Sequence, residues 1–146
     1  MAKFRDSVGP SLLILFCIWS GTALRAQPTC QTLQNSVIEL EAVKYLLASG
    51  DYDNFFEFVS AKTSNEIQTR QFVEELKRVF PEGFLSCSTV MSEMKSPRII
   101  EELVIFEGEG ELPFFLYWLV AVFKEEWTVL QYQVSTEFKE ISEYWK

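Results

Sequence analysis

The longest apolar run of the chain extends over residues 114–123 and reads FFLYWLVAVF. Aromatic and branched side chains favour a pleated, buried strand, and alternate residues of a strand face opposite sides. Because both sides of this run are apolar, we expect both faces of the sheet to be covered here. The run is too short for a membrane span, which takes about 20 residues. A buried helix is the alternative interpretation, since periodicity alone does not exclude it.

The next segment, residues 127–134, alternates clearly between apolar and polar positions. This pattern predicts a half-solvated strand that returns beside the first one. The charged residues Lys124, Glu125 and Glu126 predict the turn between the two strands. One side of the second strand is expected to carry Trp127, Val129, Gln131 and Gln133, and the other side Thr128, Leu130, Tyr132 and Val134.

Three amphipathic helices are predicted in the first half of the chain. Apolar residues at spacings of three and four predict the first helix over residues 32–49, and Gly50 is placed to end it. A short second helix is predicted over residues 53–60. A third helix is predicted to end at Phe80, and the T-x-x-E spacing of Thr63 and Glu66 at its start is typical of a capping box.

Strands are predicted over residues 84–94 and 98–107, although a helix is the alternative for the second of these segments. Residues 136–145 fit either an extension of the sheet or a short helix. The order of elements predicts an α+β fold in which three N-terminal helices pack on a curved antiparallel sheet of about four strands. The second sheet face must then be covered by a partner subunit, by the tail or by a ligand.

The first 26 residues have the pattern of a cleaved signal peptide. Lys3 and Arg5 form a basic start, residues 11–19 form a short apolar stretch, and small residues follow. A membrane anchor and an ordinary buried helix are the alternatives. We therefore expect residues 1–26 to be removed and residues 27–146 to form a single domain that is secreted or periplasmic.

The mature chain is expected to be strongly acidic. The full chain carries a formal net charge of -8, and removal of residues 1–26 would leave 10 basic and 20 acidic residues. Such a chain repels nucleic acid and anionic lipid. The expected partners therefore include no nucleic acid, and no membrane once the signal peptide has been cleaved.

Two cysteines remain after cleavage of the signal peptide, because Cys17 leaves with it. An even number of cysteines in an exported protein predicts a disulfide between Cys30 and Cys87. Two buried free thiols are the alternative.

Three local features resemble the nuclear transport factor 2-like superfamily. They are the break ASGDY at residues 48–52, the long strand over residues 116–123, and the closing strand that begins EWTV at residues 126–129. The resemblance covers residues 32–135 and implies a cone-shaped domain whose curved sheet wraps its N-terminal helices. Within the superfamily the chain is similar to small exported domains of unknown function. The chain departs from the superfamily in lacking the usual Gly or Asp just before Trp127. The resemblance therefore does not define the register of the last turn.

Several catalytic chemistries are absent from the sequence. The chain contains no His, which removes the usual general base and the Ser-His and Cys-His pairs, and it contains no Gly-rich phosphate loop. The acidic residues at 101–102 and 125–126 are expected to be solvated. So are Glu107, Glu109 and Glu111, for which a cation site is the alternative. Glu57 is the one acid in an apolar context. We expect no cofactor, no metal site and no catalytic residues, so an enzyme is the less favoured interpretation.

Aromatic residues supply the candidate binding surface. They could fill the core of the cone, line a pocket for a small apolar molecule, or form a homodimer interface on the sheet face. The candidates are Tyr45, Phe55, Phe72, Phe115, Tyr117, Trp118 and Tyr132.

The leading hypothesis is an exported, non-catalytic interaction domain that associates with itself through its sheet. Alternatives are a carrier of an apolar ligand, an isomerase-like or hydrolase-like enzyme, and a cystatin-like protease inhibitor. The last rests on residues 131–135, which faintly resemble the Q-x-V-x-G loop of that family.

Overall fold

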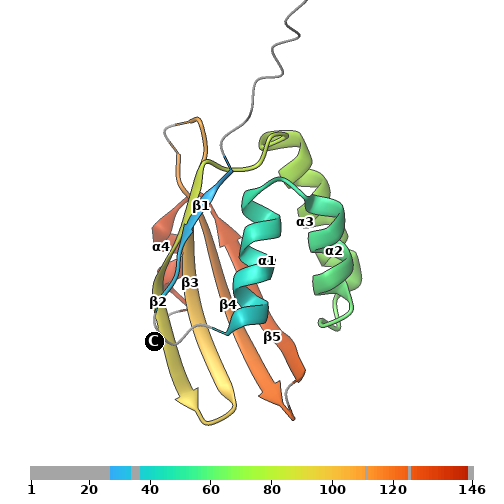
Figure 1. Ribbon diagram of the computed structural model, residues 1–146, viewed down its shortest axis with the longest axis vertical. Helices are drawn as coiled ribbons and strands as arrows, with labels where there is room; N and C mark the ends of the chain where they lie inside the picture. Colours follow the sequence, from blue (N-terminus) through green and yellow to red (C-terminus); the bar gives the residue numbers. More distant parts are fainter. Residues whose placement is uncertain (1–26, 34–36, 111, 125, 145–146) are drawn as a thin grey trace, which may run out of the picture.

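A computed structural model describes residues 27–33, 37–110, 112–124 and 126–144. The predicted signal peptide lies outside these residues. Figure 1 shows a twisted sheet with helices α1, α2 and α3 on one side and helix α4 on the other. In chain order the elements are β1 (Thr29–Gln31), α1 (Ile38–Ala48), α2 (Tyr52–Ser60), α3 (Glu66–Val79), β2 (Ser86–Ser96), β3 (Ile99–Glu107), β4 (Phe114–Phe123), β5 (Glu126–Ser135) and α4 (Phe138–Ser142).

The predicted arrangement of three N-terminal helices on an antiparallel sheet of about four strands is wrong. The fold is α+β, but its sheet has five strands in the order β1-β2-β3-β4-β5, and β1 precedes the helices and runs parallel to β2. A fourth helix follows the last strand. Strand β1 has only three residues and no apolar alternation, so no periodicity marks it in the sequence.

Strand β4 is confirmed over the whole predicted range, and its first half is covered on both faces. Its inward residues Phe114, Leu116, Trp118 and Val120 belong to the main core, together with side chains of α1, α2 and α3. Its outward residues Phe115 and Tyr117 pack in a second cluster with Leu103 of β3 and Ile141 of α4. The C-terminal tail therefore forms a short helix that covers part of the outer sheet face.

The predicted alternation of β5 is correct only for its first half. Val120 pairs with Val129 and Leu119 pairs with Gln131, so Leu130 is an extra residue in β5. A bulge of this kind shifts the phase of the side chains by one position. Trp127 and Val129 face the core before the bulge, and Tyr132 and Val134 pack against it afterwards. Gln131 and Gln133 face outward instead.

Two glycines join the helical layer to the sheet. Gly50 ends α1 with a φ of 76°, as predicted, and Gly83 precedes β2 with a φ of 75°. A Cβ on Gly83 would lie 2.5 Å from both the Ala48 carbonyl oxygen and the Gly50 nitrogen. Two backbone segments thus approach so closely that only glycine fits between them.

Two predicted helix starts are wrong. Helix α1 begins at Ile38 rather than near residue 32, and Val37 before it is extended. Helix α3 is capped by Asn65, whose side chain accepts a hydrogen bond from the Gln68 amide, so Thr63 is not its cap. Residues 99–107 form a strand, which excludes the helix alternative for that segment.

Candidate functional site

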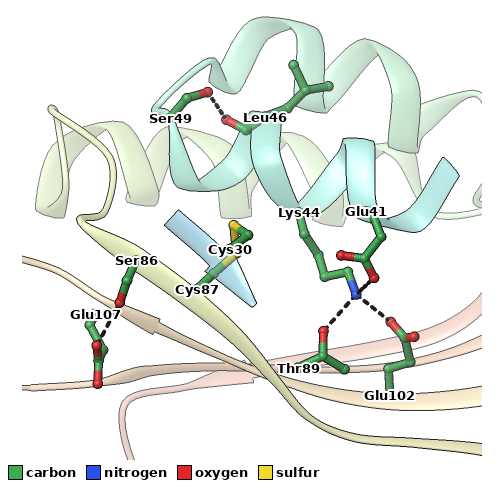
Figure 2. Close-up of a disulfide and its surroundings, with 10 residues drawn as sticks. All are labelled: Cys30, Glu41, Lys44, Leu46, Ser49, Ser86, Cys87, Thr89, Glu102 and Glu107. Atoms are coloured by element: carbon green, nitrogen blue, oxygen red, sulfur yellow. Dashed lines mark hydrogen bonds and ion pairs between the residues drawn. A yellow bond between two sulfur atoms is a disulfide. The ribbon is translucent and has the colours of Figure 1, made fainter. Parts of the chain in front are cut away.

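A buried charged cluster lies between α1 and the inner face of the sheet. Its centre is Lys44, which is only 1% exposed and extends from α1 toward β2 and β3 (Figure 2). The ammonium group is ion-paired with Glu41 one turn earlier, donates to the Thr89 hydroxyl at 2.8 Å, and reaches Glu102 at 3.2 Å. A lysine ammonium has three donors, so these partners use all of its hydrogen-bonding capacity.

Glu102 of β3 is the buried acid of this cluster, with no exposed surface. One of its carboxylate oxygens accepts from Lys44 and from the Trp118 indole nitrogen at 3.1 Å. The other accepts from the Ser92 hydroxyl at 3.0 Å. A general base needs a free oxygen within reach of a substrate proton. Both oxygens of Glu102 are already bound by protein donors, so the cluster is arranged as a structural ion pair.

A second buried acid, Glu101, lies on the outer face of the same strand. It accepts a hydrogen bond from the Tyr117 hydroxyl at 2.8 Å and is ion-paired with Lys95 at 2.8 Å. Lys95 also pairs with Glu93 at 2.9 Å. Burial, and next the hydrogen bond to Glu101, raise the pKa of Tyr117 to about 12. The phenol is therefore a neutral donor at physiological pH and a poor catalytic acid or base.

The prediction that residues 101 and 102 are solvated is therefore wrong. Neighbouring residues of a strand face opposite sides. Glu102 is therefore buried on the inner face beside Lys44 of α1, whereas Glu101 is buried on the outer face beside Tyr117 and Lys95. The position of Lys44 in its helix is a sequence signal for a buried cation, and it was not used in the prediction. It lies four residues after Leu40 and three before Leu47, on the apolar stripe of α1.

The predicted disulfide between Cys30 and Cys87 is confirmed. It joins β1 to β2 directly, because the two cysteines are cross-strand partners in the parallel pair. Figure 2 shows it on the same side of the sheet as the Lys44 cluster. A disulfide is consistent with an extracellular or periplasmic location, where such bonds persist.

The seven predicted aromatic candidates do not meet at a single site. Trp118 and Phe55 are buried in the main core, where Phe72 and Tyr132 are partly buried. Phe115 and Tyr117 lie on the outer face under α4. Tyr45 lies elsewhere on the surface, beside Pro28 and Phe84. Their main role is core packing, and two of them anchor the C-terminal helix through Phe138 and Tyr144.

An apolar cleft of about 180 Å³ lies between α3 and the ends of β4 and β5. Phe72 and Phe114 contribute to its wall with rings stacked at 6.1 Å, and Glu75 lies in its lining. Of the predicted aromatic candidates, only Phe72 lines this cleft. The remaining apolar lining residues are Leu76, Val79, Phe80 and Val134.

Part of the outer sheet face is not covered by α4. Phe123 at the end of β4 is 57% exposed, and the bulged Leu130 of β5 is 53% exposed. The Arg98 guanidinium lies 4.5 Å above the Phe123 ring. We call Phe123, Leu130 and their half-buried neighbours on the outer face the uncovered patch. The neighbours are Ile99, Leu119 and Ala121.

The other acidic candidates that the structure describes lie on the surface. Glu57 is exposed on α2, and Glu107 at the end of β3 and Glu109 in the following turn are exposed as well. Glu111 and Glu125 are outside the described residues. No group of three or more metal-ligating side chains occurs in the part of the chain that the structure describes. Residues 131–135 lie within β5 and not in a loop.

No family model matches the chain, and no curated protein or solved structure is significantly similar to it. Within the described ranges, no helix has the length and apolar character that a membrane crossing requires.

Proposed function

We propose that the chain is an exported, non-catalytic interaction domain of the nuclear transport factor 2-like type. The observation that carries this proposal is the Lys44–Glu102 pair inside the domain. Enzymes of that superfamily place acids and tyrosines in an open cavity within the cone. Here the inward acid is neutralised by Lys44 and its oxygens are occupied by Trp118 and Ser92.

Packing of the interior supports the same proposal. The space between α1 and the sheet is filled by large side chains that are less than 2% exposed, including Trp118, Lys44, Leu40 and Leu47. Close packing of this kind favours a structural core over a substrate cavity.

The uncovered patch is the surface through which we propose that the domain binds another protein chain. Exposed apolar side chains that cluster on one face typically mark an interaction site. A homodimer through the sheet face, which the sequence predicts, is the simplest form of this contact. Helix α4 covers the outer face at Phe115 and Tyr117, so such a dimer would use the end of the sheet near Phe123 and Ile99.

Sedimentation velocity over a concentration series tests this surface. We expect Phe123→Ser to weaken association, because it removes the most exposed aromatic side chain of the patch. Ile67→Ser is the matched control, since Ile67 is an equally apolar, exposed residue on α3, away from the sheet. Equally strong association of the two variants would contradict binding through the uncovered patch.

A carrier of a small apolar ligand is the second candidate function, and the cleft beside Phe72 is the observation that favours it. Its volume suits a single ring or a short acyl chain, since a cavity of about 150 Å³ accepts benzene. Leu76→Trp would fill the cleft. If the protein leaves its expression host with an apolar molecule bound and this variant does not, the carrier function is favoured.

Export itself is part of the proposal. The basic start and short apolar stretch within residues 1–26 support a cleaved signal peptide, and the disulfide supports an oxidising compartment. Determination of the N-terminal residue of the exported protein tests it, and the expected new N-terminus follows Ala26.

A further inference from the structure

Strand β2 presents a free edge over most of its length. Its pairing with β1 ends at Ser88, whereas its pairing with β3 continues to Ser96. Among the described residues, no strand lies on the other side of β2 beyond Ser88. An open strand edge carries unpaired backbone donors and acceptors and is a template for another strand.

The side chains along this edge complement a second copy of themselves. Glu93 and Lys95 both point to the outer face, because each contacts the Glu101 side of the sheet: Glu93 is the cross-strand partner of Glu101, and Lys95 forms an ion pair with it. Met94, between them, is the partner of Ile100 and is 64% exposed. The edge thus alternates acid, apolar residue and base over three positions.

Only one position of the two-fold axis on these three residues sets opposite charges against each other. In an antiparallel pair of identical strands, opposite residues share a sheet face. An axis through Met94 sets each Glu93 opposite the Lys95 of the other copy and places the two Met94 side chains together. An axis through Glu93 would set two carboxylates opposite each other, which is destabilising.

We propose that two copies of the chain pair antiparallel through the β2 edge, centred on Met94, to form one continuous sheet. The contact is isologous, as a two-fold dimer requires. It extends over residues 92–96, because Pro97 cannot donate to a ladder and the bulge at Val90 disturbs the strand on the other side. A second register shift lies inside this segment, between Met94 and Ser96, so Lys95 is an extra residue of β2 relative to β3.

This inference rests on the proposed function as an interaction domain and names the second copy as a partner. It uses a different surface from the uncovered patch. Edge pairing keeps both patches on the outer face of the joined sheet, because a two-fold axis perpendicular to a sheet preserves its faces. The two contacts use separate surfaces, so each can be removed separately.

A charge exchange at the edge tests the proposal on the protein as its host exports it. In the Glu93→Lys variant, each new lysine faces Lys95 of the other copy, and we expect the dissociation constant to rise about tenfold or more. The double variant Glu93→Lys/Lys95→Glu restores opposite charges across the axis, and we expect it to restore the dimer. It also keeps a cation opposite the buried Glu101, because residue 93 is the cross-strand partner of that acid.

Glu109→Lys is the matched control, since it makes the same change of charge in the exposed β3–β4 turn. Near-ultraviolet circular dichroism establishes that each variant is folded. Hydrogen–deuterium exchange provides a second readout, in which the amides of residues 92–96 are expected to become protected as the protein concentration rises.

A wild-type protein that stays monomeric at high concentration would overturn the proposal, and so would a dimer that Glu93→Lys leaves intact. If Phe123→Ser dissociates the dimer and Glu93→Lys does not, the second copy binds through the uncovered patch. That outcome rejects the edge contact and leaves the proposed function standing. If neither Phe123→Ser nor Glu93→Lys weakens association and the protein carries an apolar molecule, both the edge contact and the proposed interaction function fail.

Discussion

Removal of the Lys44 ammonium group is the most informative perturbation of the core. In the Lys44→Met variant a side chain of similar length remains on α1, but Glu102 loses its cation. Glu102 has no exposed surface and keeps only the donors Ser92 and Trp118. Loss of one partner of a buried ion pair typically costs about 3–5 kcal/mol of unfolding free energy. Because the Glu41 side chain is 19% exposed and that of Glu102 is not exposed at all, the cost should arise mainly at Glu102.

A double-mutant cycle separates the ion pair from general packing. In Glu102→Gln the side chain keeps an acceptor for Trp118 but carries no charge. We expect Lys44→Met/Glu102→Gln to be more stable than Lys44→Met alone, with a coupling energy of about 1–3 kcal/mol. Lys77→Met is the control for an exposed pair, since Lys77 contacts Asp53 at the surface, and its cost should be much smaller than that of Lys44→Met.

Guanidinium denaturation followed by tryptophan fluorescence measures these differences, because Trp118 donates directly to Glu102. The predicted order of stability is wild type, then the double variant, then Lys44→Met. A Lys44→Met protein as stable as Lys77→Met would refute the reasoning, because the loss of the cation beside the buried Glu102 would then carry no cost.

Three further predictions follow from the structure. Replacement of both Cys30 and Cys87 by Ser should lower the unfolding free energy by about 4 kcal/mol on the loop-entropy model, measured by denaturant titration, and a loss below 1 kcal/mol would show that β1 contributes little. Gly83→Ala should cost about 2 kcal/mol or more, because it places a Cβ against the backbone at Ala48 and Gly50 in a left-handed conformation; a neutral result in thermal melts would contradict the close approach. The folded-state pKa of Tyr117 lies above its ordinary value of 10.0, so the stabilisation linked to its proton is complete below pH 10 and is lost as the pH rises to about 12. Tyr117→Phe should remove that part of the pH dependence, and unchanged alkaline titration of stability in this variant would exclude Tyr117 as its source.

The strongest sequence signals predicted the structure well. The bounds of β4 match because Pro113 and the charged turn frame an unbroken apolar run. The disulfide followed from the two cysteines that remain after the predicted cleavage. These features depend on the local composition of the chain or on its number of cysteines. A single sequence contains both kinds of information.

Features that depend on tertiary contacts were not predicted. Strand β1 is held against β2 by parallel pairing and by the Cys30–Cys87 disulfide, and its three residues carry no pattern of their own. The bulge at Leu130 reverses the faces of β5 through one extra residue. Its sequence signal is the adjacent apolar pair Val129 and Leu130, which a strict alternation does not allow. Glu102 was expected in solvent because its cation, Lys44, lies 58 residues away in the chain.

The native mass of the exported, oxidised protein tests the central claim most directly. Native mass spectrometry should show a dimer whose mass is that of two mature chains with one disulfide each and no additional molecule. A monomer that carries a co-purified apolar compound would contradict the interaction function and favour a carrier that uses the cleft beside Phe72.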